Sequence, residues 1–159
     1  LVSLMLMILV NKKNMALLNI NIKELVLINE MSMTIGLVML TIGNFLGGMW
    51  ANESWGRYWG WDPKETWALI SIIIYAFVIH MRLIPGLKSN FTFTVASILS
   101  FGSIIMTYFG VNFYLAGLHS YAKDDQEISL VFIGSALAII LILSLLAYPK
   151  YNKFLKNNR

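Results

Sequence analysis

Residues 50–67 read Trp50-Ala51-Asn52-Glu53-Ser54-Trp55-Gly56-Arg57-Tyr58-Trp59-Gly60-Trp61-Asp62-Pro63-Lys64-Glu65-Thr66-Trp67. This stretch contains all five tryptophans of the 159-residue chain, and long apolar segments flank it on both sides. A short aromatic and polar stretch between two long apolar segments indicates a loop that joins two membrane spans.

The simplest interpretation of these rings is an aromatic belt, because Trp and Tyr collect at membrane–water interfaces. A belt would distribute them over several segment ends, whereas here one loop holds them, with Gly56 and Gly60 between them. Glycine lets a backbone turn tightly or approach a flat ligand closely. A binding surface is therefore the competing interpretation.

The composition places the whole chain in a membrane. It is 58% hydrophobic and only 13% charged, and its apolar runs are long enough to span a bilayer. A span must satisfy its own backbone hydrogen bonds, so we predict an all-α polytopic helical bundle that forms one membrane domain. The expected segments are a truncated span end (1–10), an amphipathic linker (11–29), four spans (31–50, 63–84, 91–116 and 129–148), a tryptophan-rich loop (51–62) and a second loop (117–128).

Local signals set several of these boundaries. Asp62 can cap the second span, Pro63 suits its first position, and Glu65 completes a capping box. Pro149 is expected to end the last span. The first residue is Leu and residues 1–10 are too short to span, so we expect the chain to be the C-terminal part of a longer one.

The distribution of basic residues predicts the orientation. Nine of the twelve Lys and Arg residues lie in the linker, the 82–88 turn and the tail after Pro149, whereas the two other loops contain three. The positive-inside rule therefore places the C-terminus in the cytoplasm and both special loops outside. We interpret the basic tail as an orientation signal, and we expect no nucleic-acid partner.

The chain has two histidines and no cysteine. His80 lies near the end of the second span and His119 lies in the loop on the opposite face. A histidine in a membrane protein can be a hydrogen-bonded packing residue, and neutral imidazole is also a common ligand of haem iron. Without cysteine, the chain cannot supply a thiolate ligand or a sulfur nucleophile.

A flat apolar macrocycle with a central metal and peripheral carboxylates would suit these groups. Indole faces could stack on it, imidazole could bind the metal, and Arg57 or Lys64 could pair with carboxylates. The alternative for Arg57 and Lys64 is ordinary interface charge, and capping alone explains Asp62 and Glu65.

Residues 55–69 resemble the tryptophan-rich signature, or WWD motif, of the cytochrome c assembly protein family. The nearest branch is its CcsA-type haem-handling membrane proteins. Residues 50–53, the His80-Met81-Arg82 segment and residues 117–121 also resemble this branch. The resemblance covers about residues 31–122.

The resemblance implies a role in cytochrome c maturation. Such proteins carry haem b as a transported substrate to the outer membrane face and present it for attachment to the CxxCH thiols of apocytochrome c. This makes the protein a component of a haem lyase that acts by positioning haem. A partner membrane protein of the CcsB or ResB type, separate or fused, is also implied.

The resemblance assigns haem contact to one set of residues: Trp55, Arg57, Tyr58, Trp59, Trp61, Asp62, His80 and His119. Within this set, His119 would bind the iron of an outer haem and His80 that of an inner haem. The family has partner histidines nearer its N-terminus, and this chain contains no further histidine.

Two alternatives remain. The protein could export or relay haem without ligating it to a cytochrome, or it could be a permease-type subunit that binds no haem. We expect the bacterial inner membrane as its location, with the plastid thylakoid membrane as the alternative.

Overall fold

The computed structural model describes residues 2–8, 22–115 and 130–156. Every regular element in these ranges is helical. In chain order the elements are α1 (Val2–Ile8), α3 (Ile22–Trp55), α4 (Pro63–His80), the 3-10 helix η1 (Met81–Leu83), α5 (Asn90–Ile105), the π-helix η2 (Met106–Gly110), α6 (Val111–Tyr114) and α7 (Leu130–Lys156).

Four segments of the described residues are long and apolar enough to cross a membrane. They are Ile22–Trp55, Pro63–Leu83, Asn90–Tyr114 and Ile133–Lys156. The predicted all-α, polytopic membrane fold with four full spans is therefore confirmed.

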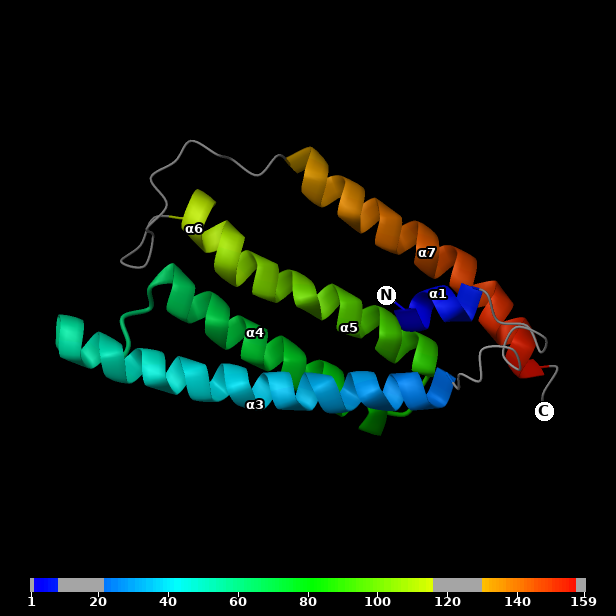
Figure 1. The fold of residues 1–159 in the computed structure, drawn as a ribbon, viewed down its shortest axis with the longest axis horizontal. Helices are drawn as coiled ribbons and strands as arrows, with labels where there is room; N and C mark the ends of the chain where they lie inside the picture. Colours follow the sequence, from blue (N-terminus) through cyan, green and yellow to red (C-terminus); the bar gives the residue numbers. More distant parts are fainter. Residues whose placement is uncertain (1, 9–21, 116–129, 157–159) are drawn as a thin grey trace.

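The long helices lie roughly side by side (Figure 1). Helices α3, α4 and α5 contact one another, and α7 lies on the far side of α5 from α3. The short helix α1 packs against the C-terminal half of α7. The turn after α3 lies at one end of this bundle, and η1, α1 and the end of α7 lie at the other.

Buried apolar side chains gather at the end of the bundle that carries α1. The cluster draws on every long helix and includes Leu4, Met7, Val26, Phe93 and Ala147. Elsewhere α3 and α7 present long rows of exposed Leu, Ile, Met and Phe side chains. Exposed apolar rows suit helices whose outer surface faces lipid.

The first span is longer than predicted. We expected residues 31–50, but α3 runs from Ile22 to Trp55. Its first turns include residues 22–29 of the predicted linker, because Ile22 and Val26 are buried in the core cluster and no proline interrupts the helix. The rest of the predicted linker, residues 11–21, lies outside the described residues.

The last span also continues past its predicted end. We expected Pro149 to stop it at residue 148, but α7 runs through Pro149 to Lys156. Ala147 and Tyr151, on either side of the proline, are both buried in the core cluster. Their burial holds the helix together across the one backbone hydrogen bond that proline removes.

The second and third spans lie close to their predicted ranges. The second span ends with η1 at Leu83, next to the predicted residue 84. The third begins at Asn90 and is helical to Tyr114, but it contains the π-helical turn η2. Within it, Ser100 and Ser103 are buried and Ser97 accepts a hydrogen bond from Asn29 of α3, so this serine face packs inside the bundle.

Candidate functional site: the tryptophan-rich turn

The turn begins where glycine ends α3. Gly56 has a φ of 70° and donates its N–H to the carbonyl oxygen of Asn52 at 2.8 Å. This is the left-handed helix cap that glycine adopts without steric cost. The loop predicted for residues 51–62 is therefore shorter, because residues 51–55 stay helical up to this cap.

The turn ends at the predicted capping box. Asp62 Oδ2 accepts the backbone N–H of Lys64 at 3.2 Å, and Glu65 Oε2 accepts that of Asp62 at 3.2 Å. The same Glu65 oxygen accepts the N–H of Gly60 at 2.7 Å. One carboxylate therefore fixes two backbone groups of the turn, and the capping role predicted for Asp62 and Glu65 is confirmed.

This bracing leaves two aromatic rings exposed. Tyr58 is 65% exposed and Trp61 is 72% exposed. Trp61 has a φ of 56° and is the only non-glycine residue with positive φ in the described part of the chain. A left-handed Trp costs roughly 1–2 kcal/mol, and such strain clusters at functional sites.

The indoles form two perpendicular pairs. Trp59 and Trp61 have ring centroids 5.8 Å apart at an interplanar angle of 90°. Trp50 and Trp55, at the end of α3, are 5.1 Å apart at 80°. Edge-to-face contacts stabilise each pair, so each of these four indoles is supported by a neighbouring ring.

A cavity of about 460 Å³ lies beneath the turn, between α3 and the start of α4. Gly43, Gly47 and Gly48 form part of its α3 wall, and Tyr58 and Trp59 belong to its lining. A Cβ atom on Gly48 would lie 3.2 Å from the carbonyl oxygen of Tyr58. The turn therefore folds directly onto α3, and the absence of a side chain at residue 48 permits that approach.

Polar groups enter this cavity from three helices: Asn44, Lys64, Glu65 and Thr107. Lys64 Nζ also donates to Asn112 Oδ1 at 3.4 Å. The hydroxyl of Thr107 lies 3.1 Å from the carbonyl oxygen of Trp67 and 3.0 Å from the hydroxyl of Ser71. These contacts tie the π-helical turn, a feature often found at functional sites, to the first turns of α4.

Sequence reasoning did not assign a role to Thr107. A threonine in an apolar helix has no distinctive pattern, and η2 cannot be recognised from the sequence. In the structure, Gly110 leaves room for the Met106 side chain, because a Cβ atom there would lie 2.1 Å from Met106 Sδ.

Arg57 folds back over the turn. Its guanidinium carbon lies 2.7 Å from where a Cβ atom on Gly60 would be. The side chain therefore lies over the Gly60 backbone, at the same end of the bundle as the exposed rings. Six predicted contact residues lie together at this end: Trp55, Arg57, Tyr58, Trp59, Trp61 and Asp62.

His80 lies at the other end of α4. Its ring is exposed, and Nδ1 donates to the carbonyl oxygen of Ala76, one turn earlier, at 2.7 Å. A neutral imidazole bound in this way has Nε2 available for a metal ion. His119 lies outside the described residues, so the structure does not place it beside the tryptophans. Among the described residues, no group of three or more His, Cys, Asp or Glu side chains could hold a metal ion.

Comparison with known proteins agrees with the family resemblance of the tryptophan-rich stretch. A model of the cytochrome C assembly protein family matches residues 1–119, a range that includes the turn and both histidines. The protein NrfI of Wolinella succinogenes is 56% identical over 128 residues, which are 80% of this chain and 14% of that protein. The cytochrome c biogenesis protein CcsA of Cuscuta reflexa is 49% identical over 102 residues, or 64% of this chain and 33% of that protein.

A second CcsA protein, from Prochlorococcus marinus strain MIT 9301, is 46% identical over 99 residues. Those residues are 62% of this chain and 32% of that protein. The chain thus spans about a third or less of the length of these curated relatives.

Proposed function

Because the chain belongs to the cytochrome c assembly protein family, we propose that it binds haem and presents it to apocytochrome c during cytochrome c maturation. Haem is the substrate in this proposal, and the chain acts by holding and orienting it. The four membrane-crossing helices support a role within a membrane.

The tryptophan-rich turn is the observation that carries this proposal. Tyr58 and Trp61 are exposed large rings on a backbone that Glu65 and Gly56 hold in place. A flat apolar ligand gains contact area on such rings without having to order them first. The guanidinium of Arg57 lies at the same end, where it could pair with a carboxylate of haem.

We assign iron binding to the two histidines. His119 would bind the iron of an outer haem held against the turn, and His80 that of an inner haem at the other end of α4. The fixed Nδ1 contact of His80 supports its role, because the remaining ring nitrogen is then the basic one.

The thiols in this proposal come from the CxxCH segment of apocytochrome c, since the chain contains no cysteine. Each cysteine thiol would add across a vinyl group of haem, its sulfur bonding to one carbon and its hydrogen moving to the other. The contribution of the chain is orientation, which lowers the entropic cost of the encounter.

We further propose that a CcsB- or ResB-type membrane protein completes the assembly. The proposed membrane is the bacterial inner membrane, with the C-terminus in the cytoplasm. The described basic residues of the α7 end, Lys150, Lys153 and Lys156, support this orientation.

Single substitutions of the exposed rings test the proposal. Trp61→Ala and Tyr58→Ala should each weaken haem binding by about 1–3 kcal/mol, because each removes one apolar contact surface. The matched control is Tyr148→Ala, which removes an exposed ring on α7 at the other end of the bundle. The measurement is the haem that copurifies from cells whose chromosomal gene carries each variant, normalised to protein.

The proposal predicts a graded loss for Trp61→Ala and Tyr58→Ala and no loss for Tyr148→Ala. Equal haem content in all three variants, at equal protein level, would contradict the proposal and favour the interpretation of the turn as an ordinary aromatic belt.

A further inference from the structure

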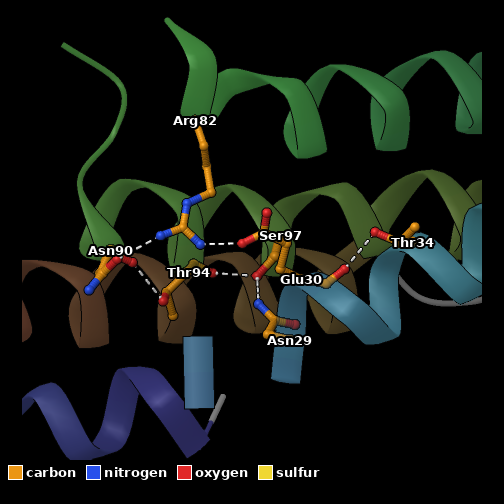
Figure 2. Close-up of polar contacts among 7 residues, drawn as sticks. All are labelled: Asn29, Glu30, Thr34, Arg82, Asn90, Thr94 and Ser97. Carbon is orange, nitrogen blue, oxygen red and sulfur yellow. Dashed lines mark hydrogen bonds and ion pairs between the residues drawn. The ribbon is translucent and has the colours of Figure 1, made fainter. Parts of the chain in front are cut away.

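A polar cluster joins three elements (Figure 2). These elements meet at the end of the bundle opposite the tryptophan-rich turn (Figure 1). Arg82, in η1, forms an ion pair with Glu30 of α3. Its other guanidinium nitrogen donates to Asn90 Oδ1 at 3.1 Å, at the first residue of α5. We refer to Glu30, Arg82 and Asn90 as the Arg82 cluster.

The cluster is only partly open to solvent. The side chains of Arg82 and Glu30 are 29% and 30% exposed. The guanidinium also lies over the Phe93 ring, 5.2 Å from its centroid, and Phe93 is fully buried. Only arginine combines a planar stacking face with several donors in a fixed geometry, so lysine could not reproduce all three contacts.

A second set of hydrogen bonds runs beside the cluster (Figure 2). Asn29 Nδ2 donates to Ser97 Oγ at 2.7 Å, and Ser97 Oγ donates to the carbonyl oxygen of Thr94 at 2.9 Å. Thr94 Oγ1 in turn donates to the carbonyl oxygen of Asn90 at 2.8 Å. This set links α3 directly to α5 and does not involve η1, so Arg82 is the residue that adds η1 to the connection.

His80 lies at the junction between α4 and η1. Its ring is fixed on the α4 side by the bond from Nδ1 to the Ala76 carbonyl oxygen. On the other side, Met81 is buried and Arg82 is fixed by its cluster. The ring is exposed, but the backbone that carries it is held on both sides.

We propose that Arg82 is a positioning residue for His80, acting through Glu30 and Asn90 to set where the imidazole lies. The inference rests on the proposed function, in which His80 binds haem iron. Removing a group that bonds a metal ligand directly commonly lowers metal affinity 10–100-fold. Arg82 acts one step further away, through the backbone that carries His80, so we expect an effect at the lower end of that range. The Arg82 cluster fixes the backbone, and the Ala76 carbonyl fixes the ring.

The test compares four variants in the chromosomal gene: His80→Ala, Arg82→Ala, Arg82→Lys and Lys88→Ala. Lys88→Ala is the matched control, because Lys88 is an exposed cation on the same turn. The readouts are protein amount, haem copurified per protein, and the absorption spectrum of that haem, each with and without added imidazole. We expect Arg82→Ala to lower haem affinity about tenfold, Arg82→Lys to lower it less, and Lys88→Ala to leave it unchanged.

Added imidazole distinguishes a role of Arg82 in positioning His80 from a role in the stability of the protein. Free imidazole needs no positioning by the backbone, so it should restore haem binding in both His80→Ala and Arg82→Ala. If Arg82→Ala does not accumulate, Asn90→Ala replaces it, because that variant removes one contact of the guanidinium and keeps the ion pair.

Three results would contradict the inference. Wild-type haem content and spectrum in Arg82→Ala, alongside a loss in His80→Ala, would remove the positioning role and leave the proposed function intact. A loss in Arg82→Ala and Asn90→Ala that imidazole does not restore would assign the cluster to stability alone. A normal haem content and spectrum in His80→Ala would overturn the inner haem site itself, and the inference with it.

Discussion

The two ends of the helical bundle use polar side chains differently. At the tryptophan-rich end, Asp62 and Glu65 bind backbone N–H groups of their own turn. At the other end, Glu30 and Arg82 reach across to different elements. Both ends contain charged residues in an otherwise apolar chain, but the two carboxylates of the first end shape a single turn, whereas the carboxylate of Glu30 helps to hold helix ends together.

We propose a functional meaning for this difference. A turn stabilised from within keeps its outer surface free, and Trp61 and Tyr58 occupy that surface. The Arg82 cluster instead connects three elements, and in our proposal it fixes the backbone around His80. The first end suits presentation of a flat ligand, and the second suits accurate placement of one ligand atom.

The largest effect is expected in a test of whether the two ends of the bundle lie on opposite sides of the membrane. The chain has no cysteine, so Tyr58→Cys and Lys88→Cys each introduce a single thiol into it. A membrane-impermeant maleimide applied to intact cells should label Tyr58→Cys and spare Lys88→Cys, which should react only after lysis. The unsubstituted protein is the control, and the reverse labelling pattern would invert the proposed orientation.

A large energetic effect is expected from Glu65→Ala. This substitution leaves the N–H groups of Gly60 and Asp62 without their acceptor, at a cost of about 1–3 kcal/mol for each group that stays buried. Thermal unfolding in detergent should occur at lower temperature, and haem retention should fall. Glu53→Ala removes the same charge from an exposed position near the same end, and an equal effect there would mean that charge, not bracing, matters.

Gly56→Ala should have a smaller effect. A left-handed conformation costs a non-glycine residue roughly 1–2 kcal/mol, and Gly56 has a φ of 70°. Gly36→Ala supplies a control with the opposite expected sign, because Gly36 is helical with open space around it and alanine favours a helix interior by roughly 0.5–1 kcal/mol. If both variants changed the free energy of unfolding in the same direction, the left-handed helix cap assigned to Gly56 would be contradicted.

The smallest effect is expected from Ser97→Ala, at the opposite end. It removes the hydrogen bond from Asn29 of α3, worth about 0.5–1.5 kcal/mol. Ser144→Ala is the comparison, since the Ser144 hydroxyl donates to the Ile140 carbonyl oxygen of its own helix and not, among the described residues, to another helix. Indistinguishable unfolding temperatures for these two variants would show that the link between α3 and α5 adds nothing measurable.

Much of the fold follows from local sequence signals. Apolar runs predict the spans, and the Asp62-Pro63 start with Glu65 predicts the start of α4, because these signals act within a few residues of where they occur. The end of α7 could not be predicted in this way. Burial of Ala147 and Tyr151 keeps the helix intact through Pro149, and such tertiary contacts are not visible in a local pattern.

Some features of the candidate site can likewise be predicted from local sequence signals, and others cannot. The clustering of tryptophans and the capping signals locate the turn from sequence alone. The place of Thr107 in the cavity beneath the turn and the three contacts of Arg82 depend on how separate helices meet, and the left-handed backbone of Trp61 has no sequence signal. The sequence identifies Arg82 as a basic residue of the 82–88 turn and as part of a His-Met-Arg segment, but its ion pair joins residues 52 positions apart and has no local signal.

We propose above that the tryptophan-rich end holds haem whose iron is bound by His119. It is tested most directly by the absorption spectrum of the haem that copurifies with His119→Ala. The account predicts an altered spectrum at a normal protein level, because the tryptophans still hold the ring while the iron has lost a ligand, together with loss of mature cytochrome c. An unchanged spectrum with normal cytochrome c maturation would contradict it.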